Sequence, residues 1–268
     1  MNAQGRLIDL TSPKVMGIMN VTPDSFFDGG RHNTIDAALR HAEKLLDEGA
    51  DLLDIGAYSS RPGAANVSID EEVSRLLPVI DAITTRFPEA VLSIDTFRAD
   101  VARAAIEAGA HVINDISGGT LDEQMFATVA ELQVPYILMH MRGTPDTMQQ
   151  LTDYTDLVEE VNLFFGKQIA ALRRLGVKDL ILDPGFGFAK TLQQNYDLLN
   201  RLEELHIHGL PILGAISRKS MIYKKLGITP AEALNGTTAL HALLLAKGVQ
   251  ILRVHDVKAA KEVITLLK

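Results

Sequence analysis

Short apolar runs alternate with amphipathic helical patterns along this chain, and no other feature restricts its possible folds as strongly. Eight such runs occur, at residues 15–21, 51–57, 90–95, 111–116, 134–139, 179–183, 211–216 and 250–255. Most are nearly continuous Val, Ile, Leu and Met, which is typical of strands buried on both faces of a parallel sheet. The segments between them, such as 34–48 and 69–87, carry apolar residues at helical spacing.

The number of repeats favours a closed barrel over an open sheet. Eight βα units in 268 residues average 268/8 ≈ 33 residues each, close to the size of a βαβ unit. A doubly wound sheet is the alternative, but the glycine fingerprint of dinucleotide-binding folds is missing. No linker, charge run or low-complexity segment divides the chain. We therefore predict an α/β fold of the (β/α)8 TIM-barrel class, a single domain over residues 1–268 with a short N-terminal leader.

Composition excludes several classes of protein. The absence of Cys excludes disulfides, thiolate nucleophiles and Cys-bound metal centres. A formal charge of 26 − 34 = −8 argues against a nucleic-acid partner, because proteins that bind nucleic acid usually present a basic face. The sequence has no run of about 18 apolar residues and therefore predicts no membrane span. Its first residues lack the apolar segment of a signal peptide. We expect a cytoplasmic protein that acts on small molecules, with no membrane partner.

Polar side chains follow the predicted strands, at the end of a barrel where active sites lie. They are Asn20, Asp54, Asp95, Asn114, Asp115, His140, Asp183, Ser217, Arg218, Lys219, Arg253, His255 and Asp256. A ring of buried carboxylates costs solvation and repels itself, so a purely structural barrel has no need of it. The sequence therefore predicts a binding site at this end.

Two groups of residues indicate the ligand. Asp95, Asn114 and Asp183 suit a heterocycle with amino and ring N–H groups, such as a 2-amino-4-oxo-pyrimidine, and Lys219 adds a donor. Each Asp has the alternative reading of a helix N-cap, and Lys219 that of a solvated lysine at a helix start.

The second group is cationic. Arg61, Arg253 and His255, with Asn20 on the neighbouring strand, suit a phosphate or pyrophosphate, and a nearby anion favours protonated His. The alternative for His255 is a satisfied core histidine. Two Gly- and Pro-bearing loops, 22–32 and 58–66, have the composition of loops that close over a substrate, or of ordinary surface loops.

Seven motifs resemble those of the dihydropteroate synthases, the folate-pathway enzymes among the pterin-binding barrels. They read MGIMNVTPDSF at 16–26, SIDT at 93–96, INDISGG at 113–119, MHMRGTP at 139–145, LDPGFGF at 182–188, SRKS at 217–220 and RVHDV at 253–257. They follow the family order across nearly the whole chain, and seven linked motifs are far more specific than one.

The resemblance implies a reaction. The family condenses 6-hydroxymethyl-7,8-dihydropterin pyrophosphate with p-aminobenzoate, giving 7,8-dihydropteroate and pyrophosphate. The mechanism is dissociative (SN1-like): pyrophosphate leaves first, and the arylamine attacks the resulting pterin methylene cation. The absence of Cys agrees, because no enzyme nucleophile is needed. The resemblance also implies Mg2+ as cofactor, a homodimer, and a target of sulfonamides.

The motifs also imply residue roles. The pterin would be bound by Asp95, Asn114, Met139, Asp183 and Lys219. The pyrophosphate would be held by Asn20, Ser60, Arg61, Arg253 and His255, with Asn20 as a ligand of Mg2+. The p-aminobenzoate would lie against Phe26, Pro62, Gly187, Phe188 and Ser217. The catalytic residues would be Asp28, Asp95, Lys219 and Arg253, with Asp95 stabilising the cation and Asp28 shielding it from water.

One segment departs from the family pattern. Where the family often has GGESTRP, this chain reads GAYSSRP at 56–62, so Tyr58 replaces an acid and Ser60 a threonine. Two alternatives therefore stay open. One is a methyltransferase of the pterin-binding barrels that uses methyltetrahydrofolate, which the predicted pyrophosphate cluster disfavours. The other is a non-catalytic pterin-binding paralogue, for which Tyr58 is the only indication.

Overall fold

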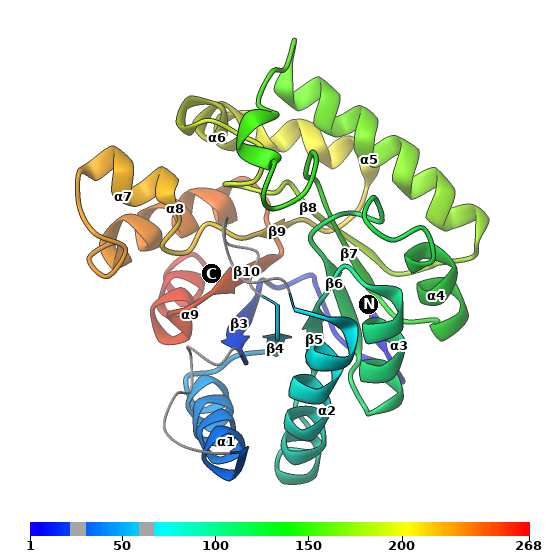
Figure 1. The fold of residues 1–268 in the computed structure, drawn as a ribbon. Helices are drawn as coiled ribbons and strands as arrows, with labels where there is room; N and C mark the ends of the chain where they lie inside the picture. The colour runs from blue at the N-terminus through cyan, green and yellow to red at the C-terminus, as the bar shows by residue number, and fades with distance from the viewer. Residues whose placement is uncertain (22–30, 59–66) are drawn as a thin grey trace.

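The strands of the computed structural model form a parallel barrel, in agreement with the prediction. The structure describes residues 1–21, 31–58 and 67–268, without the side chains of 31–34. The strands are β3 (Lys14–Asn20), β4 (Leu52–Gly56), β5 (Leu92–Asp95), β6 (Val112–Asp115), β7 (Tyr136–Met139), β8 (Leu180–Asp183), β9 (Leu213–Gly214) and β10 (Ile251–Val254). They form one 8-stranded sheet in the order β8-β7-β6-β5-β4-β3-β10-β9. A parallel bridge between Leu182 and Ile212 joins the two ends of this order and closes the barrel (Figure 1).

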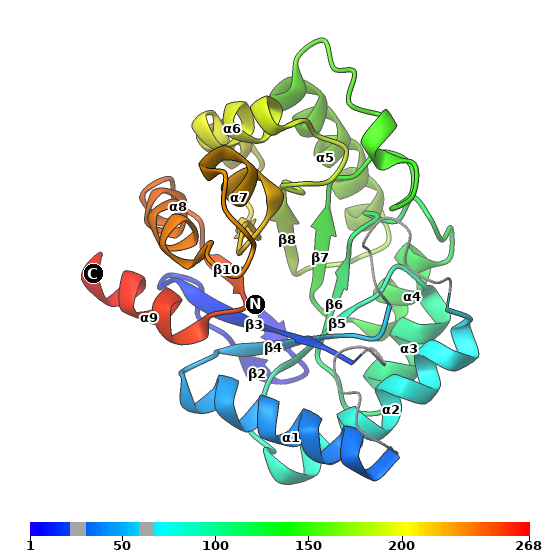
Figure 2. The ribbon, with the colours of Figure 1, turned by 60° about the vertical axis from the view of Figure 1, so that its left-hand side comes forward.

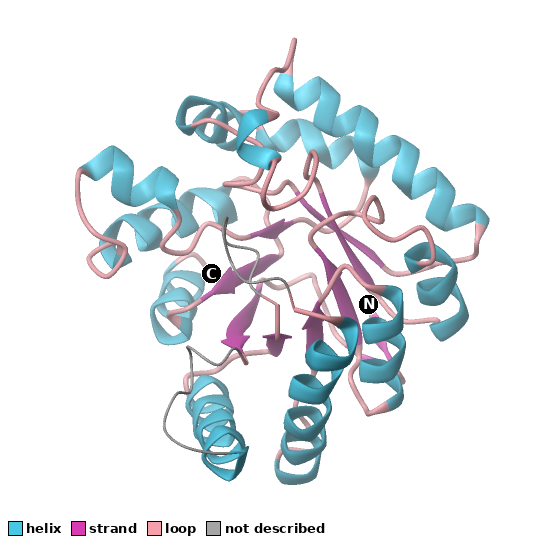
Figure 3. Cartoon of the chain, viewed as in Figure 1, coloured by secondary structure: helices cyan, strands magenta, loops and turns pink. Residues whose placement is uncertain are grey.

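Helices surround the barrel on its outer side, as Figures 2 and 3 show. They are α1 (Arg31–Asp47), α2 (Ile69–Arg86), α3 (Ala99–Glu107), α4 (Met125–Leu132), α5 (Leu157–Arg174), α6 (Leu192–Asn200), α7 (Ser220–Leu226), α8 (Leu234–Ala246) and α9 (Val257–Leu266). Short 3-10 helices occur at η2 (Met148–Gln150) and η3 (Leu202–His208). None of the helices in the described part of the chain is long and apolar enough to cross a membrane.

Two boundaries differ from the sequence prediction. The amphipathic pattern at residues 193–205 predicts one helix, but α6 ends at Asn200 and the chain continues as the 3-10 helix η3. The seventh strand is regular only over Leu213–Gly214 rather than 211–216, because it pairs with β10 over only these two residues and meets β8 through the single bridge at Ile212.

Both faces of the strands are buried, which explains why the runs are apolar without alternation. Successive side chains of a strand point to opposite faces, so every second residue lines the barrel interior. The layer nearest the amino ends of the strands is apolar and takes one residue from each strand or its start: Met16, Leu52, Val91, Val112, Ile137, Ile181, Leu213 and Ile251. Residues of the other parity, such as Leu53, Ile94 and Leu138, pack in the larger core that includes the helices.

The N-terminal leader is folded against the amino end of the barrel. β1 (Asn2–Ala3) and β2 (Arg6–Leu7) pair as an antiparallel hairpin. Gln4 and Gly5 at its turn both have positive φ, 51° and 89°, as the tight turns favoured in hairpins require. Ala3 is fully buried in the interior cluster, and the backbone N–H of Asn2 donates to Asp179 Oδ2 at 3.0 Å. The leader therefore covers the apolar layer, a role that its sequence alone did not indicate.

Candidate active site

The alternation of side chains along each strand places the predicted site residues on the interior face. Two positions beyond the apolar layer are Asp54, Ser93, Asn114, Met139, Asp183 and Arg253, and two positions further toward the carboxyl ends come Asn20, Asp95, Ser217 and His255. The strand register agrees, because Asp95 is paired with Asn114 and Met139 with Asp183 across neighbouring strands. The interior is thus apolar at one end and polar at the other.

Asp54 is the centre of the polar layer. Its carboxylate is fully buried and accepts three hydrogen bonds. Ser93 Oγ donates to Oδ1 at 2.6 Å, while Asn114 Nδ2 and Arg253 Nε donate to Oδ2 at 3.0 and 2.5 Å. The same Arg253 donates through Nη2 to Asp95 Oδ2 at 2.6 Å. One guanidinium therefore bridges two carboxylates from β4 and β5.

This arrangement shifts the titration of Asp95 and Arg253. Burial raises the pKa of Asp95 to about 7, and the Asp54 charge adds to it, although Arg253 opposes the shift. Burial alone would lower the pKa of Arg253, but the two carboxylates outweigh it and raise that pKa further. Arg253 stays charged, whereas Asp95 changes its charge near neutral pH.

A second region of buried charged groups lies at the carboxyl end of β8. Asp183 is 3% exposed and accepts a hydrogen bond from the Gly185 N–H at 2.8 Å. Lys219 Nζ donates to the Phe186 carbonyl at 2.5 Å and lies 4.8 Å from the centroid of the Phe188 ring. Burial raises the pKa of Asp183, which Lys219 opposes, and burial lowers the pKa of Lys219 to about 8. The two groups of opposite charge compensate one another in a desolvated pocket.

Ser217 and His255 form a third unit, between β9 and β10. Their side chains lie 3.0 Å apart (Oγ to Nδ1), and the His255 N–H donates to Ser217 Oγ at 3.2 Å. His255 is exposed, although partial desolvation of its ring lowers the pKa of His255 to about 4, and Arg253 adds to this shift. Without an anion the imidazole is therefore neutral. A bound anion would raise that pKa.

An apolar cluster lines one side of the mouth. It contains Ile116, Met139, Met141, Met148 and Ala189, with Phe97, Leu121 and Phe188 packed against it. These side chains offer a wall for an aromatic ring, beside the carboxylates of β5 and β8.

Some polar residues at the strand ends do not join the interior site, although the sequence predicts a binding site at this end from all of them. Asp115 has the other parity and accepts from Ser117, Gly119 and the Tyr136 hydroxyl outside the barrel wall. Arg218 binds Asp256 through two hydrogen bonds of 2.7 and 2.9 Å.

His140 also has the other parity, and it contacts Lys190. Sequence reasoning missed Lys190, which is 4% exposed, and gave no role to Asp54 or Ser93. The alternation of side chains along the strands was the signal that could have separated the two faces.

Five predicted residues lie outside the described part of the chain: Phe26, Asp28, Ser60, Arg61 and Pro62. At the edge of the described part, Tyr58 forms an edge-to-face contact with Phe97, with 5.1 Å between ring centroids. The Arg98 guanidinium lies 5.2 Å from the Tyr58 ring and pairs with the buried Glu72 at 2.7 Å. Tyr58, which replaces the acid of the family pattern, thus contacts Arg98 through its ring.

The described residues contain no group of three His, Cys, Asp or Glu that would hold a metal by themselves. Mg2+ has a different requirement, since it is usually bound by one or two protein oxygens together with substrate phosphates and water. Asn20 is exposed at the end of β3, whose neighbour β10 carries Arg253 and His255, and its amide oxygen is a suitable hard donor. The residues present therefore fit Mg2+ held mainly by an anionic substrate.

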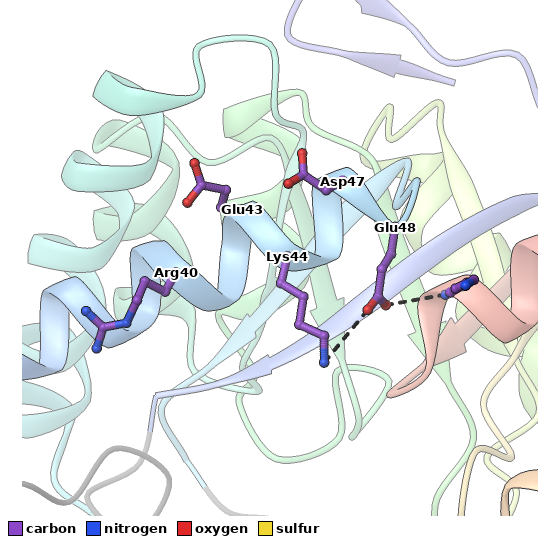
Figure 4. A pocket seen from close by; sticks show the side chains of 6 residues that line it. Arg40, Glu43, Lys44, Asp47 and Glu48 are labelled. Carbon is purple, nitrogen blue, oxygen red and sulfur yellow. Dashed lines mark hydrogen bonds and ion pairs between the residues drawn. The ribbon is translucent and has the colours of Figure 1, made fainter.

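A separate surface pocket lies between α1 and α9. Its lining is charged throughout: Arg40, Glu43, Lys44, Asp47, Glu48 and Lys258. Lys44 and Glu48 approach within 3.7 Å, and Figure 4 shows their side chains pointing toward one another along α1. Three acids and three bases line it without a common charge, and the lining side chains include no residue of the interior site.

Known proteins resemble this chain over nearly its full length. The family described as pterin binding enzyme matches residues 16–255. The dihydropteroate synthase of Escherichia coli K12 is 46% identical over 269 residues, covering 99% of this chain and 94% of the relative.

Two solved structures agree with this. The Yersinia pestis dihydropteroate synthase in a sulfonamide drug complex has a TM-score of 0.92 at 44% identity, over 100% of this chain and 97% of that one. The Xanthomonas albilineans enzyme with 4-aminobenzoic acid has a TM-score of 0.92 at 42% identity, over 99% and 96%. With the barrel and its polar interior, these matches show that the chain belongs to the dihydropteroate synthase family of pterin-binding enzymes.

Proposed function

We propose that this chain condenses 6-hydroxymethyl-7,8-dihydropterin pyrophosphate with p-aminobenzoate, giving 7,8-dihydropteroate and pyrophosphate. The observation that carries the proposal is the polar layer of the interior, where Arg253 bridges Asp54 and Asp95 beside Asn114. This layer combines buried acceptors for a pterin with a permanent cation for a leaving anion.

The pterin would be recognised by the buried acceptors. The Asp183 and Asp95 carboxylates would accept from its amino and ring N–H groups, and Asn114 would pair with a neighbouring edge. Lys219 would donate to the pterin carbonyl or a ring nitrogen, and Met139 would pack on the ring. Binding to buried groups that are already held in place favours pterin over ligands without the matching donors, because such ligands leave the groups unpaired.

The departure of pyrophosphate would be the step that the cations promote. Arg253 and His255, with Arg61 and Ser60, would bind the developing negative charge. The approach of the anion would favour protonation of His255, which would strengthen the interaction. When bound, Mg2+ would neutralise the pyrophosphate oxygens, with Asn20 as its protein ligand. The chain would need no covalent nucleophile, because the bond breaks before the amine attacks.

The methylene cation left on the pterin would be stabilised by the Asp95 carboxylate. Asp28 would limit its capture by water. The p-aminobenzoate would lie against the apolar wall with Phe188, beside Gly187 and Ser217, together with Phe26 and Pro62. Its amine would then attack the cation and lose one proton to solvent, and product would form without the enzyme changing its covalent state.

Release of pyrophosphate separates this proposal from its alternatives. A colorimetric phosphate assay after pyrophosphatase treatment should detect pyrophosphate from the pterin substrate, increased by p-aminobenzoate and by Mg2+. A methyltransferase would release none and would consume methyltetrahydrofolate instead. A non-catalytic paralogue would bind the pterin pyrophosphate without releasing pyrophosphate. Either of these results would refute the proposal.

We also propose that the chain forms a homodimer and acts in the cytoplasm. Exposed leucines on α7 and α8 support a dimer: Leu226, Leu234 and Leu243 are 56%, 39% and 37% exposed. Sedimentation of the wild type at twice the monomer mass, reduced by Leu243→Glu, would test this surface. The cytoplasm is proposed because a pterin pyrophosphate is highly charged and does not cross membranes unaided. Fractionation of cells would test that location.

A further inference from the structure

Lys190 is a buried ammonium group on the outer side of the barrel wall, next to the site and not part of it. It is 4% exposed and donates to three neutral acceptors: His140 Nδ1 at 3.0 Å, the Gly185 carbonyl at 3.0 Å and the Phe188 carbonyl at 3.1 Å. No ion pair within 4 Å involves Lys190 among the described residues. Burial of a cation without a direct counterion is costly, so this side chain calls for a functional reason.

The three acceptors belong to the segment that follows β8 and to the end of β7. We call residues 184–190 the β8 loop. Its backbone is strained, because Ala189 has a φ of 47°, a left-handed value that is unfavourable for a residue with a side chain. Gly185 has a φ of 70°, and a Cβ there would lie 2.0 Å from the His140 carbonyl oxygen. The loop is therefore pressed tightly against the end of β7 and needs partners to stay there.

The same loop presents its other side to the interior site. The Gly185 N–H donates to Asp183, while the Gly185 carbonyl accepts from Lys190. The Phe188 ring lies beside the Lys219 ammonium, while the Phe188 carbonyl accepts from Lys190. The loop thus lies between two buried lysines, one on each side, and single residues contact both sides.

We propose that Lys190 is a positioning residue that fixes the β8 loop from outside the barrel and thereby sets the positions of Asp183, Lys219 and Phe188. The inference rests on the proposed function, since these three residues would contact the pterin and p-aminobenzoate. His140 contributes to this positioning, because burial and the Lys190 charge lower the pKa of His140, and a neutral imidazole can accept from the ammonium at Nδ1.

Electrostatics gives Lys190 a second effect that a purely structural residue would lack. Burial lowers its pKa to about 7, and Asp183 opposes this shift. Its charge also opposes the burial that raises the pKa of Asp183. The charged and titratable groups that act on Lys190 are Asp183, Lys219, Arg142 and His140. Loss of the Lys190 charge should therefore raise the pKa of Asp183 and move the acidic limb of pterin binding to higher pH.

The test compares Lys190→Met with Lys167→Met, which removes an exposed lysine on α5 as a matched control. We expect Lys190→Met to lower kcat/KM for pterin pyrophosphate and for p-aminobenzoate by about 10- to 100-fold, as expected for a site displaced by about 1 Å. The acidic limb of its kcat/KM profile should move to higher pH. Lys167→Met should leave kcat/KM and this limb unchanged. Hydrogen exchange should accelerate at the Gly185 and Phe188 amides, which are hydrogen-bonded in the loop.

Exchange is measured without substrate, so it separates this inference from the proposed function. If the wild type lacks turnover but exchange accelerates in Lys190→Met, the proposed function fails and the positioning role stands. If exchange, pH profile and kcat/KM all match those of Lys167→Met, the inference is overturned. If Lys190→Met does not fold, His140→Leu removes one acceptor of the ammonium and should accelerate the same amides. His140→Gln retains an acceptor and should restore slow exchange, and equal exchange in these two variants would overturn the inference.

Discussion

The interior hydrogen-bond network makes a quantitative prediction at Asp54. Its Oδ1 accepts from Ser93, and its Oδ2 accepts from Asn114 and Arg253. In Asp54→Asn, an amide oxygen at the Oδ2 position keeps the hydrogen bonds from Asn114 and Arg253. The amide NH2 then faces Ser93, whose hydroxyl can rotate and accept. The variant therefore loses charge but keeps a hydrogen bond at each of the three contacts.

The expected cost follows from this count. Hydrogen bonds to a charged group contribute about 1.5–3 kcal/mol and neutral ones about 0.5–1.5 kcal/mol. Arg253 also keeps its pairing with Asp95, so no guanidinium is left without a counterion. We expect Asp54→Asn to lower the free energy of unfolding by about 1–2 kcal/mol, far less than the roughly 3–5 kcal/mol for breaking an isolated buried ion pair.

The decisive variant combines Asp54→Asn with Ser93→Ala. Ser93→Ala alone removes one bond, but in the double variant the amide introduced at position 54 has a buried NH2 without an acceptor. An unsatisfied buried donor costs about 1–3 kcal/mol, so the double variant should lose that much beyond the sum of the single changes. Urea unfolding followed by circular dichroism measures all four proteins, with an unchanged m-value as control. Additive effects within about 0.5 kcal/mol would refute the network as described.

Three further predictions concern the site. Asp54→Asn removes the like charge beside Asp95, whose pKa of about 7 should fall, so the acidic limb of kcat/KM moves to lower pH; an unmoved limb would contradict this. Pyrophosphate binding near pH 6 should take up a proton at His255, because the anion raises its pKa from about 4, and calorimetry in two buffers should find less uptake in His255→Gln. Gly185→Ala should lower the unfolding free energy by more than about 2 kcal/mol, since its Cβ would meet the His140 carbonyl; a wild-type urea midpoint would exclude this clash.

Much of the fold could be predicted from the sequence because buried parallel strands have a distinctive composition. The runs at 51–57 and 179–183 contain β4 and β8, since continuous apolar residues fit only strands covered on both faces. The extent of β9 could not be predicted in this way, because its two-residue length depends on how the barrel closes through Ile212. The hairpin of the leader could not be predicted from the sequence either, since its role comes from burial of Ala3 against distant strands.

The site was predictable in its composition but less so in its pairing. Asp95, Asn114 and Arg253 follow from strand ends and motifs. Their sequence positions do not show that Arg253 binds the carboxylates of Asp54 and Asp95. Such pairing depends on strand order around the barrel, in which β10 lies next to β3 although the two are far apart in the chain. The role of Lys190 could not be predicted for the same reason, because its partner His140 comes from another βα unit.

The most direct test of the account is the fate of p-aminobenzoate in the presence of pterin pyrophosphate and Mg2+. With carboxyl-labelled p-aminobenzoate, the wild type should form labelled 7,8-dihydropteroate and pyrophosphate in equal amounts. Omission of Mg2+ should slow both products equally, and Lys219→Ala should reduce them together through weaker pterin binding. Tight binding of the pterin pyrophosphate with no labelled product, in wild-type protein that is fully folded, would contradict the account.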